Sequence, residues 1–134
     1  MLRLSAPERQ ELIDLAVIIQ YSYYIFVWEM LMYIALVNVR CSEKPVIPMG
    51  LLSLAAMLEK HGFTVTIDDL VYEEEELKLI ERLAETKPDI IGFSFLTTAV
   101  ARTINLVDKA AKAVPHAVRI GGGAARLCGS VWVL

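Results

Sequence analysis

The sequence has few of the side chains that hold metals or form disulfide frameworks. Cys41 and Cys128 are its two cysteines, and neither has another Cys or a His at ligand spacing. This pattern excludes a disulfide framework and a metal site built from clustered Cys and His side chains. Reduced thiols are typical of an intracellular protein, so the sequence predicts a cytoplasmic location.

The chain also lacks an excess of positive charge. Its 134 residues include 13 basic and 16 acidic side chains, which gives a net charge of −3. Nucleic-acid binding usually requires a basic surface, so a nucleic-acid partner is disfavoured. The length corresponds to one ordinary domain that can bury a core.

Charge is nearly absent from the segment 15–39, in which Glu29 is the only charged side chain. Three interpretations stay open. A secretory signal is the weakest, because acidic residues precede the apolar run and no small-residue cleavage site follows it. The second is membrane contact through residues 12–32, where Tyr and Trp cluster. The third is a short helix that begins at Pro7, with Ser5 as its N-cap. It either docks on the domain or belongs to an open reading frame that extends upstream of it.

Strand-like and helix-like segments alternate along the rest of the chain. Short apolar or β-branched runs predict strands, and longer segments with helix start and stop signals predict helices. The predicted strands are 33–39, 63–67, 89–96 and 117–120, and the predicted helices are 49–60, a segment opened by the acidic run 73–76, and 99–113. This order predicts an α/β fold: a parallel sheet with helices on both faces.

Details of these elements are also predicted. Gly62 suits the C′ position after the first of these helices. Asp68 and Asp69 are expected to follow the end of the second strand. The apolar stripes of the two later helices are expected to contain Leu77, Ile80, Leu83 and Ala84 in one, and Ile104, Val107 and Ala111 in the other.

Ligands of such sheets bind beside the carboxyl ends of the strands. Small and polar residues follow several of these ends: Ser94, Thr97 and Thr98 after the third strand, and Gly121–Gly123 after the fourth. They supply hydroxyl groups and a backbone that a ligand can approach closely. Two simpler interpretations stay open, a flexible turn for the glycines and helix N-capping for the threonines.

Three stretches in this order resemble the cobalamin (B12)-binding domain of the radical S-adenosylmethionine enzyme family. They are 48–63, 88–98 and 120–123. The wider cobalamin-binding family has Asp-x-His-x-x-Gly, then Ser-x-Leu, then Gly-Gly. Ser94 and Leu96 match the second element, Gly121 and Gly122 match the third, and Gly50 matches the glycine of the first.

The resemblance implies a flavodoxin-like (Rossmann-like) fold and a set of cofactor-binding residues. Ser94 would hydrogen-bond the dimethylbenzimidazole tail, and Leu96 would line its slot. The implied cofactor-binding set is Asn38, Gly50, Ser94, Leu96, Thr97, Thr98, Gly121, Gly122 and Gly123. Ile47 stands where the family has its cobalt-ligating histidine, so the resemblance implies base-off binding without a protein ligand.

The remaining candidates for chemistry have structural interpretations. His61 and His116 have no Ser, Cys or carboxylate at a spacing that specifies catalysis, and both are expected to be structural. Cys41 either approaches the corrin face or is a surface thiol. Three closely spaced cysteines are missing, so no iron–sulfur cluster is expected within the chain.

The sequence thus predicts three regions: an apolar N-terminal extension over 1–32, a B12-binding-like domain over 33–127 and an atypical tail over 128–134. The chain alone is expected to be non-catalytic and to serve a radical S-adenosylmethionine catalytic domain or subunit, such as that of a methyltransferase. The alternative is a degenerate domain without cofactor, with a docking or structural role. This interpretation also includes a homodimer and association with a membrane.

Overall fold

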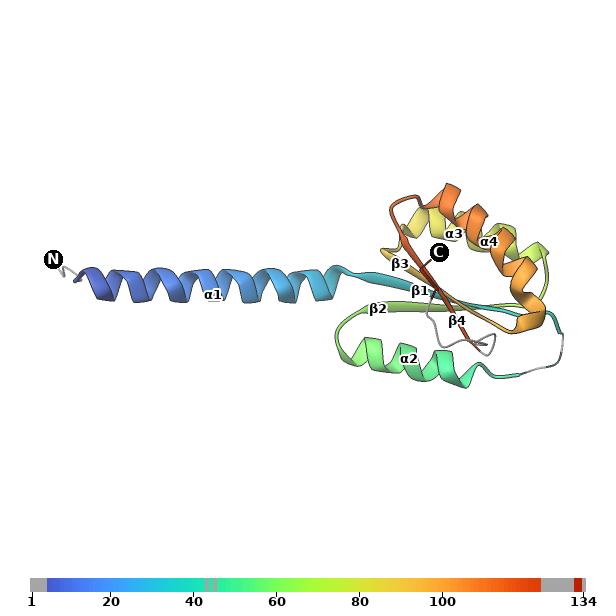
Figure 1. The fold of residues 1–134 in the computed structure, drawn as a ribbon, viewed down its shortest axis with the longest axis horizontal. Coiled ribbons are helices and arrows are strands. Elements are labelled where there is room, and N and C mark those ends of the chain that lie inside the picture. Colours follow the sequence, from blue (N-terminus) through green and yellow to red (C-terminus); the bar gives the residue numbers. More distant parts are fainter. Residues whose placement is uncertain (1–4, 43, 45, 124–131, 134) are drawn as a thin grey trace.

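The computed structural model describes residues 5–42, 44, 46–123 and 132–133. Helices and strands alternate after a long first helix, as Figure 1 shows. The helices are α1 (Ala6–Leu31), α2 (Met49–Lys60), α3 (Glu74–Thr86) and α4 (Val100–Ala113), with a short 3₁₀ helix η1 (Thr97–Ala99) before α4. The strands are β1 (Tyr33–Val39), β2 (Thr64–Leu70), β3 (Ile90–Phe95), β4 (Val118–Gly122) and β5 (Trp132–Val133).

The strands form one sheet in the order β2-β1-β3-β4-β5. β1 pairs in parallel with β2 and β3, and β3 pairs in parallel with β4. The predicted flavodoxin-like α/β fold is therefore confirmed. β5 is an addition to it, because it pairs antiparallel with β4 and is too short to give a sequence signal.

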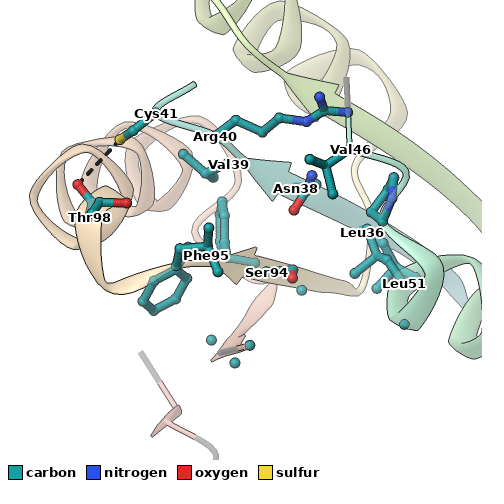
Figure 2. A pocket seen from close by; sticks show the side chains of 18 of the residues that line it. Leu36, Asn38, Val39, Arg40, Cys41, Val46, Leu51, Ser94, Phe95 and Thr98 are labelled. Carbon is teal, nitrogen blue, oxygen red and sulfur yellow. Dashed lines mark hydrogen bonds between the residues drawn. The ribbon is translucent and has the colours of Figure 1, made fainter. Parts of the chain in front are cut away.

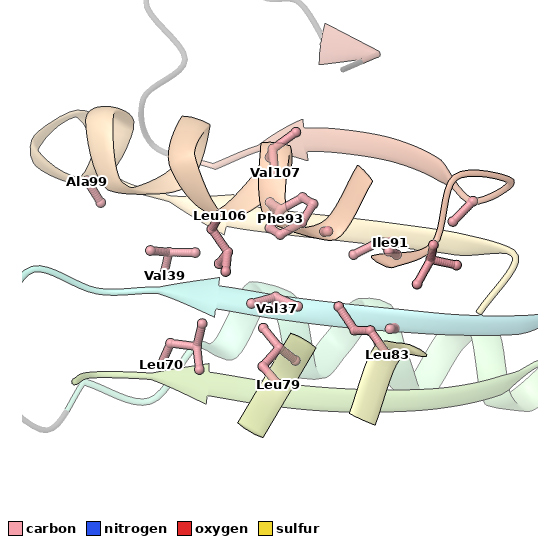
Figure 3. Packing of buried hydrophobic residues seen from close by; sticks show 14 residues of the cluster. Val37, Val39, Leu70, Leu79, Leu83, Ile91, Phe93, Ala99, Leu106 and Val107 are labelled. Atoms are coloured by element: carbon pink, nitrogen blue, oxygen red, sulfur yellow. The ribbon is translucent and has the colours of Figure 1, made fainter. Parts of the chain in front are cut away.

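Two apolar clusters lie on the two faces of the sheet. The larger cluster joins alternate residues of β1 and β3, such as Val37 and Phe93, to Leu79 of α3 and Leu106 of α4 (Figure 3). The smaller cluster packs α2 against the opposite face through Leu51. Because successive strand residues point to opposite faces, β1 contributes to both clusters and is buried on both sides.

The predicted stripe of α3 is confirmed only in part. Leu83 is buried and Ile80 packs against the larger cluster, but Leu77 is 68% exposed. Leu79, outside the predicted stripe, is 0% exposed. The buried positions are Glu76, Leu79 and Leu83. A buried glutamate therefore occupies the first turn of the core-facing stripe, and an apolar pattern cannot reveal a stripe that begins with a charged residue.

The stripe of α4 is confirmed only in part. Val107 is buried, but Ile104 is 57% exposed. The residues of α4 that lie in the core are Thr103, Leu106, Val107 and Ala110.

β2 and β4 are longer than predicted. Asp68 and Asp69 lie inside β2, and their side chains point to opposite faces of the sheet. Each carboxylate pairs with an arginine. Burial raises the pKa of Asp68, although Arg82 beside it opposes that rise. Gly121 likewise belongs to β4, so it is not in a loop.

The start of α1 agrees with the predicted N-cap. The Ser5 hydroxyl donates to Glu8 Oε2 at 2.7 Å, and the Ser5 backbone N–H donates to the same oxygen at 2.6 Å. Glu8 therefore satisfies one backbone donor at the helix start, as in a capping box.

α1 extends away from the sheet, as Figure 1 shows. Many of its apolar side chains are exposed: Leu12, Ile13, Leu15, Val17, Ile18, Ile19, Tyr21, Tyr23 and Tyr24. Among the described residues, none of the helices combines the length and the apolarity that crossing a membrane requires. Contact of this helix with a membrane surface stays a prediction.

The register of α3 can be tested with a matched pair of leucines. Leu79→Ala should lower the free energy of unfolding by about 2–5 kcal/mol, because it removes a fully buried side chain. Leu77→Ala should change it by less than about 0.5 kcal/mol, because that side chain is exposed. Urea unfolding monitored by circular dichroism measures both. Equal effects of the two substitutions would contradict the observed register.

Candidate functional site

A cavity of about 770 Å³ lies at the carboxyl ends of β1, β3 and β4. It opens on the face of the sheet that α2 covers only in part. α2 packs on β1 and β2, so the neighbouring surface of β3 and β4 faces the cavity. Figure 2 shows Leu36 of β1 and Leu51 of α2 side by side at its wall.

The sheet side of the cavity consists of two rows of residues. Leu36, Gly92 and Ile120 lie opposite one another on adjacent strands and form an apolar inner row. One pleat closer to the strand ends, Asn38, Ser94 and Gly122 form a more polar outer row. Both rows share a face because they are separated by two residues on each strand. The cavity thus changes from apolar to polar toward the carboxyl edge.

The structure brings together nearly all the residues predicted for the site. The residues of that set that line the cavity are Asn38, Gly50, Ser94, Leu96, Thr98, Gly121, Gly122 and Gly123. Thr97 lies in η1, is exposed and does not line the cavity. Their roles toward a cofactor stay a prediction.

The alternative interpretation of Thr97 and Thr98 as N-caps is wrong. The N-cap residues of η1 and α4 are Leu96 and Ala99, and no side chain caps either helix. Thr98 instead offers its backbone carbonyl, which accepts a hydrogen bond from Cys41 Sγ at 3.3 Å. This contact joins the loop after β1 to the turn after β3 at the edge of the cavity (Figure 2).

The glycines of the site have different structural reasons. A Cβ at Gly122 would meet no atom within 4 Å and would extend into the cavity. Gly123 has φ +129°, and its Cβ would lie 2.6 Å from the Phe95 carbonyl oxygen. That backbone conformation is nearly restricted to glycine, so Gly123 lets the chain pass close to β3. The flexible-turn interpretation does not hold for Gly121 and Gly122, which are strand residues.

Asp69 of β2 organises the loop that follows β1. Its Oδ1 accepts hydrogen bonds from Asn38 Nδ2 at 2.9 Å and from Arg40 Nε at 2.7 Å. Arg40 Nη2 pairs with Oδ2 of the same carboxylate, and Arg40 Nη1 donates to the Lys44 carbonyl at 3.1 Å. These bonds fix the amide of Asn38 at the outer row and hold the loop beside the cavity.

Sequence reasoning missed the apolar inner row and the helix residues opposite it. Leu36, Gly92, Leu51, Leu54 and Ile120 all line the cavity. The strand residues had a usable signal: each lies two positions before a residue of the outer row, so it shares the same face of the sheet. The residues of α2 had no such signal, because only packing places the helix over the sheet.

Comparison with known proteins identifies the family of this chain. The model of the B12 binding domain matches residues 35–129. The chain belongs to the B12-binding domain family. A search of curated proteins gives no match.

Two solved structures are similar to this B12-binding domain. Both are of TsrM, a radical S-adenosylmethionine methyltransferase from Kitasatospora setae. One contains tryptophan substrate and a SAM analogue, aza-SAM, and the other contains cobalamin and a 4Fe-4S cluster. Each comparison gives a TM-score of 0.64 and 24% identity over 70% of this chain. The chain spans 20% of the length of TsrM, so the likeness concerns the fold of one part of that enzyme.

The residues present fit the cofactor of this family. A flat aromatic base requires an apolar slot with small residues, and the inner row provides Gly92 between Leu36 and Ile120. The polar atoms of a nucleotide tail require hydrogen-bonding partners, and the outer row contains the polar side chains of Asn38 and Ser94. The cavity therefore has its apolar and polar residues in the order that a nucleotide tail needs.

The contrasting glycines can be tested through stability. Gly123→Ala should lower the free energy of unfolding by about 1–3 kcal/mol, because it forces a side chain into a glycine-only conformation against Phe95. Gly50→Ala should be neutral or raise it by up to about 1 kcal/mol, because the position is helical and a Cβ there meets nothing. Thermal and urea unfolding measure both. Equal destabilisation by the two substitutions would contradict this difference.

Proposed function

We propose that this chain is a cobalamin-binding module whose cavity receives the nucleotide tail of base-off cobalamin. The family match supports cobalamin as the cofactor. The single observation that supports the site is the two-row cavity at the carboxyl edge, apolar at Leu36, Gly92 and Ile120 and polar at Asn38 and Ser94. A ligand that is planar and apolar at one end and polar along its tail matches that order.

In this proposal each part of the site has a separate task. Ser94 holds the base through its hydroxyl, and Gly122 leaves room for the nucleotide beside β4. Asn38 faces the ligand with an amide that Asp69 orients. Leu96 and Thr98 border the opening. When bound, cobalamin supplies a cobalt centre that can carry a methyl group.

The base-off proposal depends on where the histidines lie. Residues 46–48 of the loop beside the cavity are Val, Ile and Pro, and Ile47 is 67% exposed. His61 ends α2, where its Nδ1 lies 2.8 Å from the Met57 carbonyl oxygen. His116 precedes β4. Both histidines therefore lie at the amino edge of the parallel sheet, opposite the cavity.

The whole protein's context is part of the proposal. We infer that the module serves a radical S-adenosylmethionine catalytic domain, as the similarity to TsrM suggests, and that it works in the cytoplasm. The exposed apolar side chains of α1 between Leu12 and Tyr24 suit a membrane surface, and membrane contact through residues 12–32 is part of the proposal. A homodimer is a further part of it, without an assigned surface. The domain boundaries 33–127 lie close to the family match over 35–129 and stay a prediction.

A degenerate domain with a structural role is the alternative function. Ile47 at the position of the missing histidine favours it, because a site without a cobalt ligand has one interaction less with the cofactor. Binding of cobalamin separates the two functions directly.

Cobalamin titration of the full chain tests the proposed function. We expect a saturable change in the visible spectrum, and we expect Ser94→Trp to abolish it because the indole would fill the cavity. Ser53→Trp is the matched control, since Ser53 is exposed on α2 and does not line the cavity. A folded wild-type chain without spectral change would favour the degenerate domain. Loss of binding in both variants would argue against the cavity as the site.

The coordination state can be measured separately. The bound cofactor should have a base-off spectrum, and its reduced Co(II) form should lack the electron paramagnetic resonance splitting that an axial nitrogen produces. His61→Ala and His116→Ala should leave both spectra unchanged, because neither ring is near the cavity. A nitrogen splitting that one of these variants removes would contradict base-off binding without a protein ligand.

A further inference from the structure

Arg102 of α4 reaches the carboxyl ends of two strands from the face opposite the cavity. Its Nη1 donates hydrogen bonds to the backbone carbonyls of Arg40 and Val71, the latter at 3.0 Å. These residues directly follow β1 and β2. A single guanidinium thus holds two backbone segments in place where both leave the sheet.

Glu76 fixes the orientation of this guanidinium. Glu76 is 6% exposed, and its Oε1 accepts a hydrogen bond from Arg102 Nε at 2.7 Å. Its other oxygen pairs with Lys109 Nζ at 3.4 Å. A buried ion pair contributes little net stability, because desolvation of both charges offsets their attraction. Because replacing such a pair by apolar residues is often neutral for stability, we looked for a role in the contacts that Arg102 makes.

The segment that Arg102 holds is the loop that borders the cavity. Arg40 is its first residue, and the Arg40 side chain binds Asp69 and the Lys44 carbonyl from the cavity side. Cys41, the next residue, reaches the Thr98 carbonyl. The loop is therefore held from both faces of the sheet, and Arg102 supplies the contact from the α4 side.

We propose that Arg102, oriented by Glu76, is a positioning residue that fixes the loop after β1 in the geometry that binds cobalamin. This inference rests on the proposed function. Removing Arg102 takes away the hydrogen bond to the Arg40 carbonyl. The loop residues Arg40, Cys41 and Lys44, which line the cavity, are then held less firmly. The effect should therefore concern affinity for the cofactor and the state of the loop more than the fold.

Two variants separate positioning from general stability. Arg102→Met removes the hydrogen bonds. The double variant with Glu76→Leu also avoids a buried carboxylate that has lost its closer cationic partner, so it serves if the single variant does not fold. Arg82→Met is the matched control. Arg82 pairs with Asp68 on the same face of the sheet, but it does not contact the loop.

The state of the loop can be measured without cofactor, because Cys41 is an exposed free thiol. In a full chain with Cys128→Ser, the rate of Cys41 labelling by Ellman's reagent reports on the loop. We expect faster labelling in both Arg102 variants and an unchanged rate in Arg82→Met. Equal rates in all four proteins would overturn the proposal.

Cobalamin titration of the same proteins completes the test. The Arg102 variants should bind roughly 10- to 100-fold more weakly, the usual effect of losing a group that orients a site. Unchanged affinity beside a wild type that binds would also overturn the proposal. If the wild type binds no cobalamin, the proposed function is wrong instead. The labelling rates alone then show whether Arg102 positions the loop.

Discussion

Parallel pairing of β1 with β2 and β3 is the constraint on which the rest of the structure depends. Parallel neighbours require crossover connections, so every strand of the set ends at the same edge of the sheet. That geometry brings Asn38, Ser94 and Gly122 into one row although they are far apart in the sequence. It also sends both histidines to the other edge. The composition of the outer row and the distance of His61 and His116 from it therefore have one topological cause.

The cavity exists because the two faces of the sheet are covered unequally. α3 and α4 cover one face and enclose the larger cluster, which includes Val37 and Phe93. α2 packs over β1 and β2 on the other face, and beside it Gly92 and Gly122 keep the surface of β3 and β4 free of bulky side chains. Close packing leaves few empty spaces in a protein interior, so this cavity is the place where we propose that the ligand binds.

Charged residues take positions in this fold that an apolar pattern cannot anticipate. Glu76 lies in the core-facing stripe of α3, where Arg102 compensates its charge. Asp68, which is partly buried, and Asp69, which is exposed, continue β2, and each pairs with an arginine on its own face of the sheet. A charge as buried as that of Glu76 is tolerated only with such partners. The partners come from distant parts of the chain, so the sequence pattern misplaced part of the stripe of α3 and the end of β2.

The sequence by itself determined the elements that local signals specify. β1 and α2 have the predicted bounds, and Gly62 follows α2 with a positive φ of 90° as its C′ position requires. Continuous apolar runs and glycine stops need no tertiary information. Motif order also indicated the family and eight of the residues that line the cavity.

Only the tertiary structure decided which residues share the cavity wall and what holds that wall in place. Thr97 and Thr98 are neighbours in sequence, yet only Thr98 lines the cavity, because η1 turns the chain between them. Leu51 joins the site through helix packing, and Arg102 reaches the loop from the opposite layer. Such contacts depend on how the helices pack on the sheet, and that arrangement is a property of the whole fold.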